Sequence, residues 1–486
     1  LGFKWDAEVK CWYTNDKKII KKVKNYCEAD FLNIKEKLKE NFQLSFATDS
    51  NINIPVRDDL SYLSFQKAGI DFLNRNSQAL IGDEMGLGKT IQALGFINLK
   101  SFKNLLIITN ASLKINWKKE SEKWLVNNYD INILQSSDKY EFASGILIVN
   151  YDILKKFEKQ LIKSKFDYVI ADEVHYVKNK STQRSSSFYK IVKDIQYKAY
   201  LSGTPIVDKP AQLYHIIKSL GYNESISSYR NMYCGMYWNG FAMVEGTPTN
   251  LDHLQAKLRS RFMIRRLKKD VLHDLPDKMR QIIYVEDKTC LKTEKETVSQ
   301  YLHNDNLSDE DYNNFIGGLS NFTPGFIGLI SKIRKENALL KLPFCFNIIK
   351  ETLESKDKIV IFAHHKEVVD RLMEEFKDIA VKLDGSTSME DRQKAVDKFQ
   401  NDPKTRIFVG SILASGTGIT LTASDHCIFV EMDWTPSNMR QAEDRLHRIG
   451  QKSNVTIQYI VVDNSIDSMI AKKLVKKEDV FNKIFN

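Results

Sequence analysis

The sequence is poor in the residues that mark extracellular, zinc-bound and fibrous proteins. Its six cysteines lie far apart in 486 residues and include no Cys-x-x-Cys pair, so neither a disulfide framework nor a structural zinc site is expected. With only 21 glycines and 9 prolines, a collagen-like or low-complexity chain is excluded. No apolar run approaches the roughly 20 residues that cross a bilayer. We therefore expect a reduced, intracellular protein without a membrane partner, in the cytoplasm of a prokaryotic or virus-infected cell or in a eukaryotic nucleus.

The chain does contain enough apolar material for several cores, with 42% hydrophobic and 28% charged residues. At roughly 100–200 residues per domain, its length predicts two to four domains. The 72 Lys and Arg against 62 Asp and Glu give a net charge of +10, which is compatible with a polyanionic partner but does not require one. Because the sequence starts at Leu1 rather than Met, it leaves open whether residues precede it.

From Leu60 onward, short runs rich in Ile, Val and Leu alternate with amphipathic helical stretches. Such runs are typical of parallel strands buried on both faces, and their alternation with helices favours a doubly wound α/β fold. A second series follows an irregular region at 206–345. The expected strands are 79–82, 105–109, 146–150, 168–171 and 199–202 in the first series, and 358–363, 380–383, 406–409, 426–430 and 455–461 in the second.

These patterns divide the chain into four parts. Residues 1–50, with early aromatics and a Lys-rich helical stretch at 16–42, form a small accessory module; 51–270 form the first α/β lobe, 271–345 a mostly helical connector or brace, and 346–486 the second lobe. Ligands of such sheets bind beyond the carboxyl ends of the strands, so functional residues are sought there.

A glycine-rich loop follows the first expected strand and opens a helix. This is the context that a phosphate-binding loop requires. Backbone N–H groups around Gly86 and Gly88 can surround phosphates at the helix N-terminus, Lys89 can reach the β- and γ-phosphates, and Thr90 can hold Mg²⁺. The strict pattern has Gly where this chain has Asp83. The other matches make a chance glycine-rich turn a poor alternative, so ATP and Mg²⁺ are the expected cofactors.

Two acidic residues end a later hydrophobic strand. There Asp172 fits a Mg²⁺ ligand and Glu173 fits the group that orients the attacking water. Such pairs are common at strand ends, and the pair gains weight because it follows a phosphate-binding loop. Ser202 and Thr204 end the next strand, where small hydroxyl residues can sense a bound phosphate, although a plain turn is the favoured interpretation when the segment is taken alone. Gln66 precedes the loop and can pair with adenine, but alone it is a surface glutamine.

Two arginines three residues apart mark the second lobe. On a helix, Arg445 and Arg448 would share one face. Across a cleft from a phosphate-binding loop, they could neutralise charge that develops on the γ-phosphate, as arginine fingers do. The alternative is a solvated basic face.

Together these segments resemble the Swi/Snf-type ATPases of helicase superfamily 2. The resemblance covers roughly residues 60–470 in motif order, and the family folds as two RecA-like lobes that close on ATP and move along duplex DNA. The residues that carry it are DEMGLGKT (83–90), DEVH (172–175), LSGTP (201–205), RRLKKDVLHDLPDK (265–278), DGSTSMEDRQKAVDKF (384–399), ASGTGITLTAS (414–424) and QAEDRLHRIGQ (441–451).

The resemblance implies a role for each matching position. It makes Gln66 the adenine contact, Asp172 and Glu173 the Mg²⁺ and water pair, and Arg445 and Arg448 the fingers, with Lys89 in the catalytic set. The chain departs from the family pattern at 207–208 and at 415–418, which indicates a divergent member. The nucleotide loop that the resemblance implies consists of Asp83, Glu84, Met85, Gly86, Leu87, Gly88, Lys89 and Thr90.

DNA contacts are expected at the strand ends that face the cleft, where small polar groups suit phosphate oxygens. For Arg265 and Arg266, DNA contact and an interlobe brace are equally good interpretations. An aromatic insert (Tyr229, Tyr233, Tyr237, Trp238 and Phe241) favours packing over base stacking. The candidate DNA contacts are Asn110, Ser112, Asn116, Trp117, Asn150, Tyr151, Asp152, Arg265 and Arg266.

The branch of the family is indicated by segments 63–72, 338–343 and 431–436, which resemble the annealing helicases. Residues 1–50 are loosely similar to the HARP accessory module of that branch, although a hairpin core with buried tryptophans is an equal alternative. The expected function is an ATP-dependent translocase, acting as a monomer on double-stranded DNA, that remodels or anneals branched DNA such as replication forks. The alternative is a general duplex translocase that displaces DNA-bound proteins.

Overall fold

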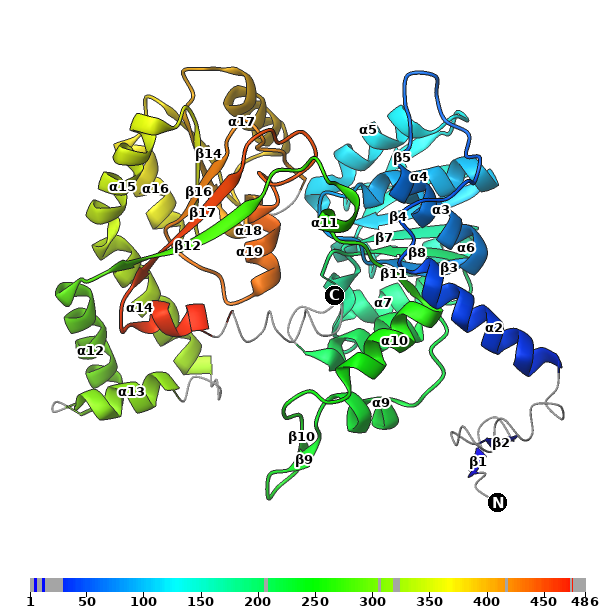
Figure 1. Ribbon diagram of the computed structural model, residues 1–486, viewed down its shortest axis with the longest axis horizontal. Coiled ribbons are helices and arrows are strands. Elements are labelled where there is room, and N and C mark those ends of the chain that lie inside the picture. Colours follow the sequence, from blue (N-terminus) through cyan, green and yellow to red (C-terminus); the bar gives the residue numbers. More distant parts are fainter. Residues whose placement is uncertain are drawn as a thin grey trace.

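The computed structural model describes residues 4–6, 11–13, 29–204, 209–304, 307–317, 324–415, 418–472 and 474. Side chains before residue 36 lie outside this description. Two lobes stand side by side, each built on one parallel sheet (Figure 1). The predicted fold class, α/β with two lobes that are each built on a parallel sheet, is confirmed. Among the described helices, none is long and apolar enough to cross a membrane.

The first sheet has the order β11-β3-β8-β7-β4-β6-β5, and all its neighbouring strands are parallel. Five of its strands match predicted runs within two residues at each end, whereas the short strands β5 and β11 were not foreseen. The strands are β3 (Gln78–Ile81), β4 (Asn104–Thr109), β5 (Ile131–Ile133), β6 (Gly145–Asn150), β7 (Tyr168–Asp172), β8 (Tyr197–Leu201) and β11 (Met263–Ile264).

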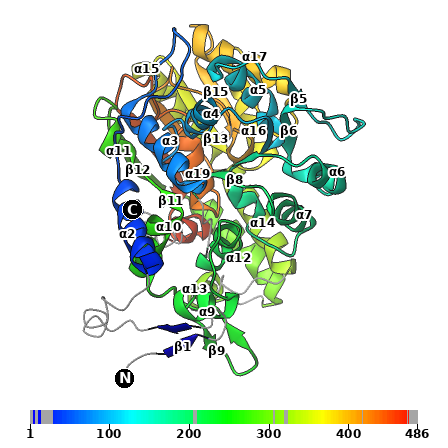
Figure 2. The ribbon, with the colours of Figure 1, turned by 90° about the vertical axis from the view of Figure 1, so that its right-hand side faces the viewer.

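Alternate residues of these strands point into two cores, one on each face of the sheet. Leu106 of β4 packs on one side and Ile107 on the other. One core receives α3 (Ser64–Asn76), α4 (Lys89–Lys100) and α5 (Lys114–Trp124). The opposite core receives α6 (Glu158–Lys163), α7 (Gln183–Val192), α8 (Tyr214–Lys218), α9 (Ile226–Tyr233) and α10 (Leu251–Arg261) (Figure 2).

The first lobe also has elements outside its central sheet and the helices that cover it. The helix α2 (Ala29–Leu44) leads into the first lobe and packs on α10. The hairpin of β9 (Tyr237–Trp238) and β10 (Met243–Val244) projects from the lobe (Figure 1). Near the N-terminus β1 (Lys4–Asp6) pairs antiparallel with β2 (Cys11–Tyr13), with Trp5 opposite Trp12. The 3-10 turns are η2 (Ala111–Leu113), η3 (Tyr151–Ile153), η4 (Val174–Val177) and η5 (Pro210–Leu213).

The second sheet has the order β12-β17-β16-β13-β15-β14 and is also parallel. Its edge strand β12 falls in the region predicted to be a mostly helical connector, so that interpretation was incomplete. The strands are β12 (Lys278–Val285), β13 (Ile359–Ala363), β14 (Ala380–Leu383), β15 (Ile407–Ser411), β16 (His426–Phe429) and β17 (Val455–Val462).

Helices cover both faces of the second sheet as well. One face receives α12 (Lys288–Leu302), α14 (Pro324–Leu340), α17 (Met389–Asn401) and α19 (Pro436–Glu443), and the other receives α15 (Leu342–Ser355) and α16 (Lys366–Glu375). The remaining helices are α11 (Lys268–Val271), α13 (Asp309–Gly317) and α18 (Ile412–Ser415). Four cysteines, Cys234, Cys290, Cys345 and Cys427, are buried and free, as expected of a protein without a disulfide framework.

Candidate active site and interlobe junction

The glycine-rich loop lies between β3 and α4, as predicted. Gly86 and Gly88 have φ values of 86° and 70°, which glycine adopts without the steric cost that a Cβ brings. Lys89 is the first residue of α4, and its Nζ donates to the carbonyls of Asp83 (2.9 Å) and Glu84 (3.3 Å). The half-buried Thr90 follows it. A lysine and a helix N-terminus therefore meet in one loop, which is the arrangement that binds phosphate.

Gln66 lies directly against this loop, although it is distant from it in sequence. Its Oε1 accepts from the backbone N–H of Leu63 (3.0 Å) and so caps the start of α3. A Cβ on Gly88 would lie 2.6 Å from its Nε2. The structure thus places the amide beside the nucleotide loop and buries it, so the interpretation as a surface glutamine is wrong.

Asp172 is the last residue of β7 and faces the loop's lysine. Its Oδ2 accepts hydrogen bonds from Trp117 Nε1 (2.8 Å) and Thr109 Oγ1 (3.2 Å). Burial and the neighbouring Glu173 raise the pKa of Asp172 to about 6. A carboxylate held on one oxygen in a buried site is a good ligand for a hard cation, which would offset the cost of its burial.

Glu173 has left-handed backbone geometry, with a φ of 51°. Its Oε2 lies 3.2 Å from His175 Nδ1 and accepts from Ser202 Oγ (3.3 Å). Burial alone would raise the pKa of Glu173, but the hydrogen bond and charge of His175, together with Lys89 and Arg445, lower it. Glu173 is therefore kept ionised beside Lys89, in the state that an acceptor of a water proton needs.

Arg445 and Arg448 extend from the second lobe toward the loop. The prediction that they lie on a helix is wrong, because α19 ends at Glu443 and successive turns follow. Those turns still place the two side chains together, since Nη1 of each donates to the carbonyl of Ile419 (3.4 and 3.1 Å). A Cβ on Gly86 would lie 3.2 Å from Cβ of Arg448. Burial and the charge of Arg448 lower the pKa of Arg445 to about 10, while Glu173 and Asp172 act in the opposite direction.

Arg265 and Arg266 hold the start of the nucleotide loop, through the carbonyl of Gly82 and the side chain of Asp83. Arg266 is buried and donates Nε to Asp83 Oδ1 (2.9 Å), and its Nη2 contacts Asp83 Oδ2 and Gln92 Oε1 (2.8 Å). Arg265 is also buried, and its Nη1 donates to the carbonyls of Gly82 and Gly203. All of these contacts lie within the first lobe, so the two arginines brace the nucleotide loop and not the junction between the lobes that the sequence suggested. Their burial argues against the predicted contact with DNA.

This clamp also explains the residue that departs from the strict loop pattern. The Asp83 side chain is fully buried, and both its oxygens are used by Arg266 and Gln92. Its carboxylate therefore anchors the chain segment that leaves the first lobe and does not contact the nucleotide.

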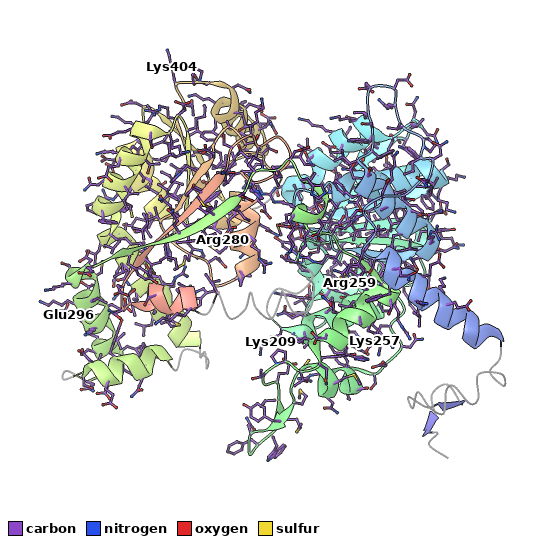
Figure 3. The ribbon with its side chains drawn as sticks, viewed as in Figure 1. Lys209, Lys257, Arg259, Arg280, Glu296 and Lys404 are labelled. Carbon is purple, nitrogen blue, oxygen red and sulfur yellow. The ribbon has the colours of Figure 1, made fainter. Side chains whose placement is uncertain are left out.

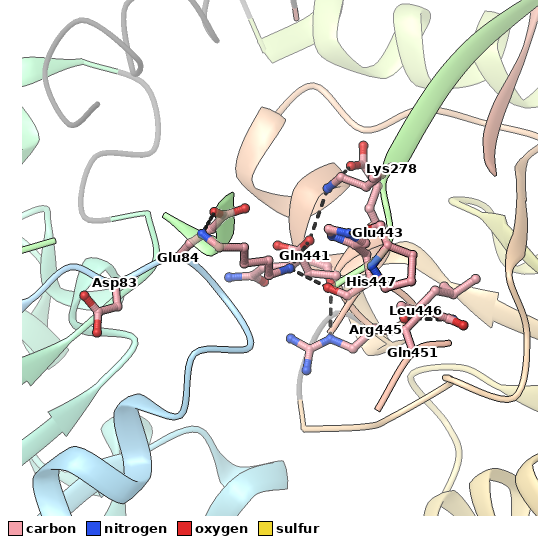
Figure 4. A network of polar contacts seen from close by, with 12 residues as sticks. Asp83, Glu84, Lys278, Gln441, Glu443, Arg445, Leu446, His447 and Gln451 are labelled. Carbon is pink, nitrogen blue, oxygen red and sulfur yellow. Dashed lines mark hydrogen bonds and ion pairs between the residues drawn. The ribbon is translucent and has the colours of Figure 1, made fainter. Parts of the chain in front are cut away.

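The two lobes meet through Lys268, which belongs to the basic stretch of the motif at 265–278, where the sequence left a solvated helix, an interlobe brace and DNA contact open. Its backbone N–H donates to Glu84 Oε2 (2.7 Å), and its Nζ donates to Asp444 Oδ1 (2.8 Å) in the second lobe. Lys278 of β12 also reaches Asp444 (3.1 Å) and Glu443 (2.8 Å). Figure 4 shows this network from Glu84 to Lys278. Arg280, labelled in Figure 3, pairs with Glu443 at 2.7 Å.

Several candidate DNA contacts are buried and serve the fold. Trp117 donates to Asp172, and the hydroxyl of Tyr151 donates to the Asp172 carbonyl (2.7 Å), so both predictions of DNA contact are wrong. Asn110 and Ser112 are partly exposed, and Asn116 is exposed. Asn150 is buried at the same sheet edge, with Nδ2 3.4 Å from Asp152 Oδ2.

The aromatic insert divides in two. Tyr229 and Tyr233 are buried in the first-lobe core, as the packing interpretation predicted. Tyr237, Trp238 and Phe241 are exposed on the hairpin of β9 and β10. The departures at 207–208 and 416–417 lie outside the described residues.

The residues present fit ATP and Mg²⁺. Hydrogen bonds hold one carboxylate oxygen of Asp172, Oδ2, and Thr90 is the second residue of α4, directly after the nucleotide loop. In the described part of the chain, no group of three or more His, Cys, Asp or Glu side chains has an arrangement that could hold a metal ion. A cation bound by few protein groups together with phosphate oxygens is the pattern typical of Mg²⁺.

Comparisons with known proteins agree with this geometry. Residues 64–309 match the SNF2-related domain, and residues 340–450 match the helicase conserved C-terminal domain. The chain is 34% identical over 480 residues to the human DNA annealing helicase and endonuclease ZRANB3, covering 93% of this chain and 43% of that protein. It is 32% identical over 427 residues to a SWI/SNF-related regulator of chromatin, subfamily A-like protein 1, of Xenopus tropicalis, covering 84% of this chain and 43% of that protein.

A solved structure is also similar, the Sulfolobus solfataricus SWI2/SNF2 ATPase core in complex with dsDNA, with 24% identity and a TM-score of 0.42 over 90% of this chain and 95% of that one. The chain spans less than half of the length of the curated relatives named above. Since the SNF2-related domain alone matches about half of the chain, and a helicase C-terminal domain follows it in order, the chain belongs to the SNF2-related family.

Proposed function

We propose that this chain is a DNA-stimulated ATPase that moves along double-stranded DNA and remodels or anneals branched DNA such as replication forks. The observation that carries the proposal is the meeting of Lys89, Asp172 and Glu173 of one lobe with Arg445 and Arg448 of the other. The choice of branched DNA is supported by the 34% identity to a protein named as a DNA annealing helicase, over 93% of this chain.

Each residue of the site has a part in the hydrolysis of ATP. Lys89 and the loop's N–H groups bind the phosphates, and the amide of Gln66 lies where it can pair with adenine. Thr90 and Asp172 would hold Mg²⁺, which neutralises phosphate charge when bound. Glu173 orients water and accepts its proton, while Arg445 and Arg448 stabilise the negative charge that develops on the transferred phosphoryl group.

The coupling of hydrolysis to movement follows from where these residues lie. The arginines belong to the second lobe and the loop to the first, so a complete site requires the lobes to be together. The partly exposed Asn110 and Ser112 and the exposed Asn116 follow the carboxyl end of β4, where they suit phosphate oxygens of a DNA backbone. Opening and closing of the lobes on such contacts is what would move the protein along DNA.

The accessory segment at 1–50 is the part that would distinguish a fork from plain duplex. Its two strands place Trp5 and Trp12 opposite each other, and Lys-rich sequence follows. Tryptophan and lysine supply stacking and phosphate contacts. Replacing both tryptophans by alanine should weaken fork binding more than duplex binding, and an equal loss on both would assign this segment a purely structural role.

The proposal is tested by ATPase rates with no DNA, single strands, blunt duplex and a model fork, at matched phosphate concentration and fixed salt. Salt must be fixed because binding to phosphates falls steeply with ionic strength. Strong stimulation, highest with the fork, is expected. Equal stimulation by duplex and fork would favour a general translocase that displaces bound proteins, and no stimulation by any DNA would reject the proposal.

A further inference from the structure

A cavity of about 320 Å³ lies at the junction of the lobes, beside the nucleotide loop. Its walls carry six cationic side chains and two carboxylates, Glu84 and Asp444. Counting also Glu443, which pairs with Lys278 and Arg280, leaves three positive charges in excess. Part of this wall is drawn in Figure 4. The cationic residues are Arg265, Lys268, Lys269, Lys278, Arg280 and Arg440.

The buried polar atoms of this wall include two that can pair with a ligand and that have no hydrogen-bond partner among the described residues. They are Oγ1 of Thr204, which is 2% exposed, and Nδ1 of His447, which is 8% exposed. A buried polar group without a partner costs free energy, so a ligand that pairs with it gains affinity. Thr204 offers a hydroxyl donor, and the cations favour an anion.

The hydrogen bonding of His447 adds a second requirement. Its Nε2 lies 2.7 Å from the carbonyl of Pro276, and because a carbonyl only accepts, Nε2 carries the proton. Burial and the charge of Lys268 lower the pKa of His447, which favours the neutral ring with a lone pair on Nδ1. The cavity therefore suits an anion that has both acceptor oxygens and a proton to donate. Hydrogenphosphate has both, whereas sulfate has no proton to donate at neutral pH.

Gly203 and Met85 lie between this cavity and Lys89 of the loop. A Cβ on Gly203 would lie 3.4 Å from Lys89 Nζ and 2.7 Å from Cγ of Met85. Gly203 and Met85 both line the cavity. Because a methionine side chain is unbranched and adapts its shape readily, Met85 can move aside without a change in the backbone.

We propose that this cavity is a second anion site, and that it receives the inorganic phosphate that ATP hydrolysis releases. The inference rests on the proposed ATPase function and adds an exit for one product. Phosphate passes from Lys89 beside Gly203 and Met85 into the cavity, while ADP stays in the loop. There Thr204 donates to one phosphate oxygen, and a P–OH group donates to Nδ1 of His447.

The test is equilibrium dialysis of radiolabelled inorganic phosphate against the full chain with Mg²⁺ and a saturating non-hydrolysable ATP analogue. The analogue fills the γ-phosphate position, so any phosphate that still binds occupies another site. One phosphate per chain is expected, with sulfate a weaker competitor than phosphate. Thr204→Val removes the hydroxyl at nearly constant volume and should weaken phosphate binding about fivefold. Lys269→Gln, at an exposed position of the wall, should weaken it as well.

A matched control is Lys103→Gln, since Lys103 lines a separate cavity of the first lobe. It should leave phosphate binding unchanged. Absence of phosphate binding by the wild type would overturn the proposal. Equal binding by the wild type, Thr204→Val and Lys269→Gln would also overturn it, because the bound phosphate would then be an adventitious ion only. If the chain fails to bind the analogue, the proposed function fails. Phosphate binding that depends on Thr204 would then still support the cavity site.

Discussion

The ammonium of Lys268 and the carboxylate of Asp444 lie 2.8 Å apart, both buried, across the junction of the two lobes. Lys268 is also fixed to the nucleotide loop, because its backbone N–H donates a hydrogen bond to the side chain of Glu84. Asp444 is the neighbour of Arg445 in sequence. One ion pair thus connects the loop that holds the phosphates to the segment that carries the arginines.

Lys268→Met should lower DNA-stimulated turnover about tenfold, which corresponds to about 1.4 kcal/mol in the barrier. The reason is that the arginines lose their fixed position while Lys89 and Gln66 still bind ATP, so kcat should fall more than KM changes. Steady-state ATPase measurements check this, with lobe closure followed by fluorescence energy transfer between labels on the two lobes.

Lys278→Met is the matched control, because Lys278 pairs with the same Asp444 from within the second sheet. It should reduce the stability of the second lobe and leave nucleotide-dependent closure intact. If the two variants affect closure equally, Lys268 has no special part in joining the lobes.

Asp83→Ala should destabilise the first lobe by about 3–5 kcal/mol, since it leaves the buried Arg266 without its carboxylate. Denaturant unfolding followed by tryptophan fluorescence measures the loss. The comparison is Glu40→Ala, which removes the exposed partner of Arg75 and should cost about 0–1 kcal/mol. Similar losses in the two variants would contradict the assignment of Asp83 as the anchor of the interlobe segment.

Glu173→Gln should abolish most hydrolysis while ATP binding remains. An amide cannot accept the water proton, and general base catalysis contributes about 10²–10⁴-fold in rate. Single-turnover hydrolysis and nucleotide binding should be measured together. Loss of binding in parallel with hydrolysis would mean that Glu173 holds the site together rather than acting on water.

Stability of the second lobe should fall in acid because of Glu443. Burial would raise the pKa of Glu443, but the charges of Lys278 and Arg280 outweigh it and lower the pKa to about 2. A carboxyl whose folded pKa lies below the unfolded value of about 4.3 stabilises the fold above that value, by about 3 kcal/mol here, and the contribution is lost as pH falls from about 4 to 2. Unfolding of the wild type and Glu443→Gln as a function of pH checks this, since the variant should lack this part of the dependence.

The sequence predicted the strands and the nucleotide loop well because both depend on local patterns. The apolar runs of β4 and β6 indicate buried strands, and Gly86, Gly88 and Lys89 stand next to one another. The clamp of Arg266 on Asp83 and the pair of Lys268 with Asp444 join residues more than 170 positions apart, so no local pattern predicts them. Trp117 and Tyr151 were misassigned because the sequence does not tell whether a polar aromatic that follows a strand faces solvent or, as here, the side chain or the carbonyl of Asp172.

Rewinding of a fork tests the central proposal most directly. The substrate is a fork whose two strands carry a fluorescent donor and a quencher, kept apart by a short unpaired bubble. We expect the wild type to rewind the bubble with ATP, and Lys89→Ala, which cannot hold the phosphates, to leave it open. Stimulated ATPase activity without any rewinding, or rewinding at the same rate by Lys89→Ala, would contradict an ATP-driven remodeller of branched DNA.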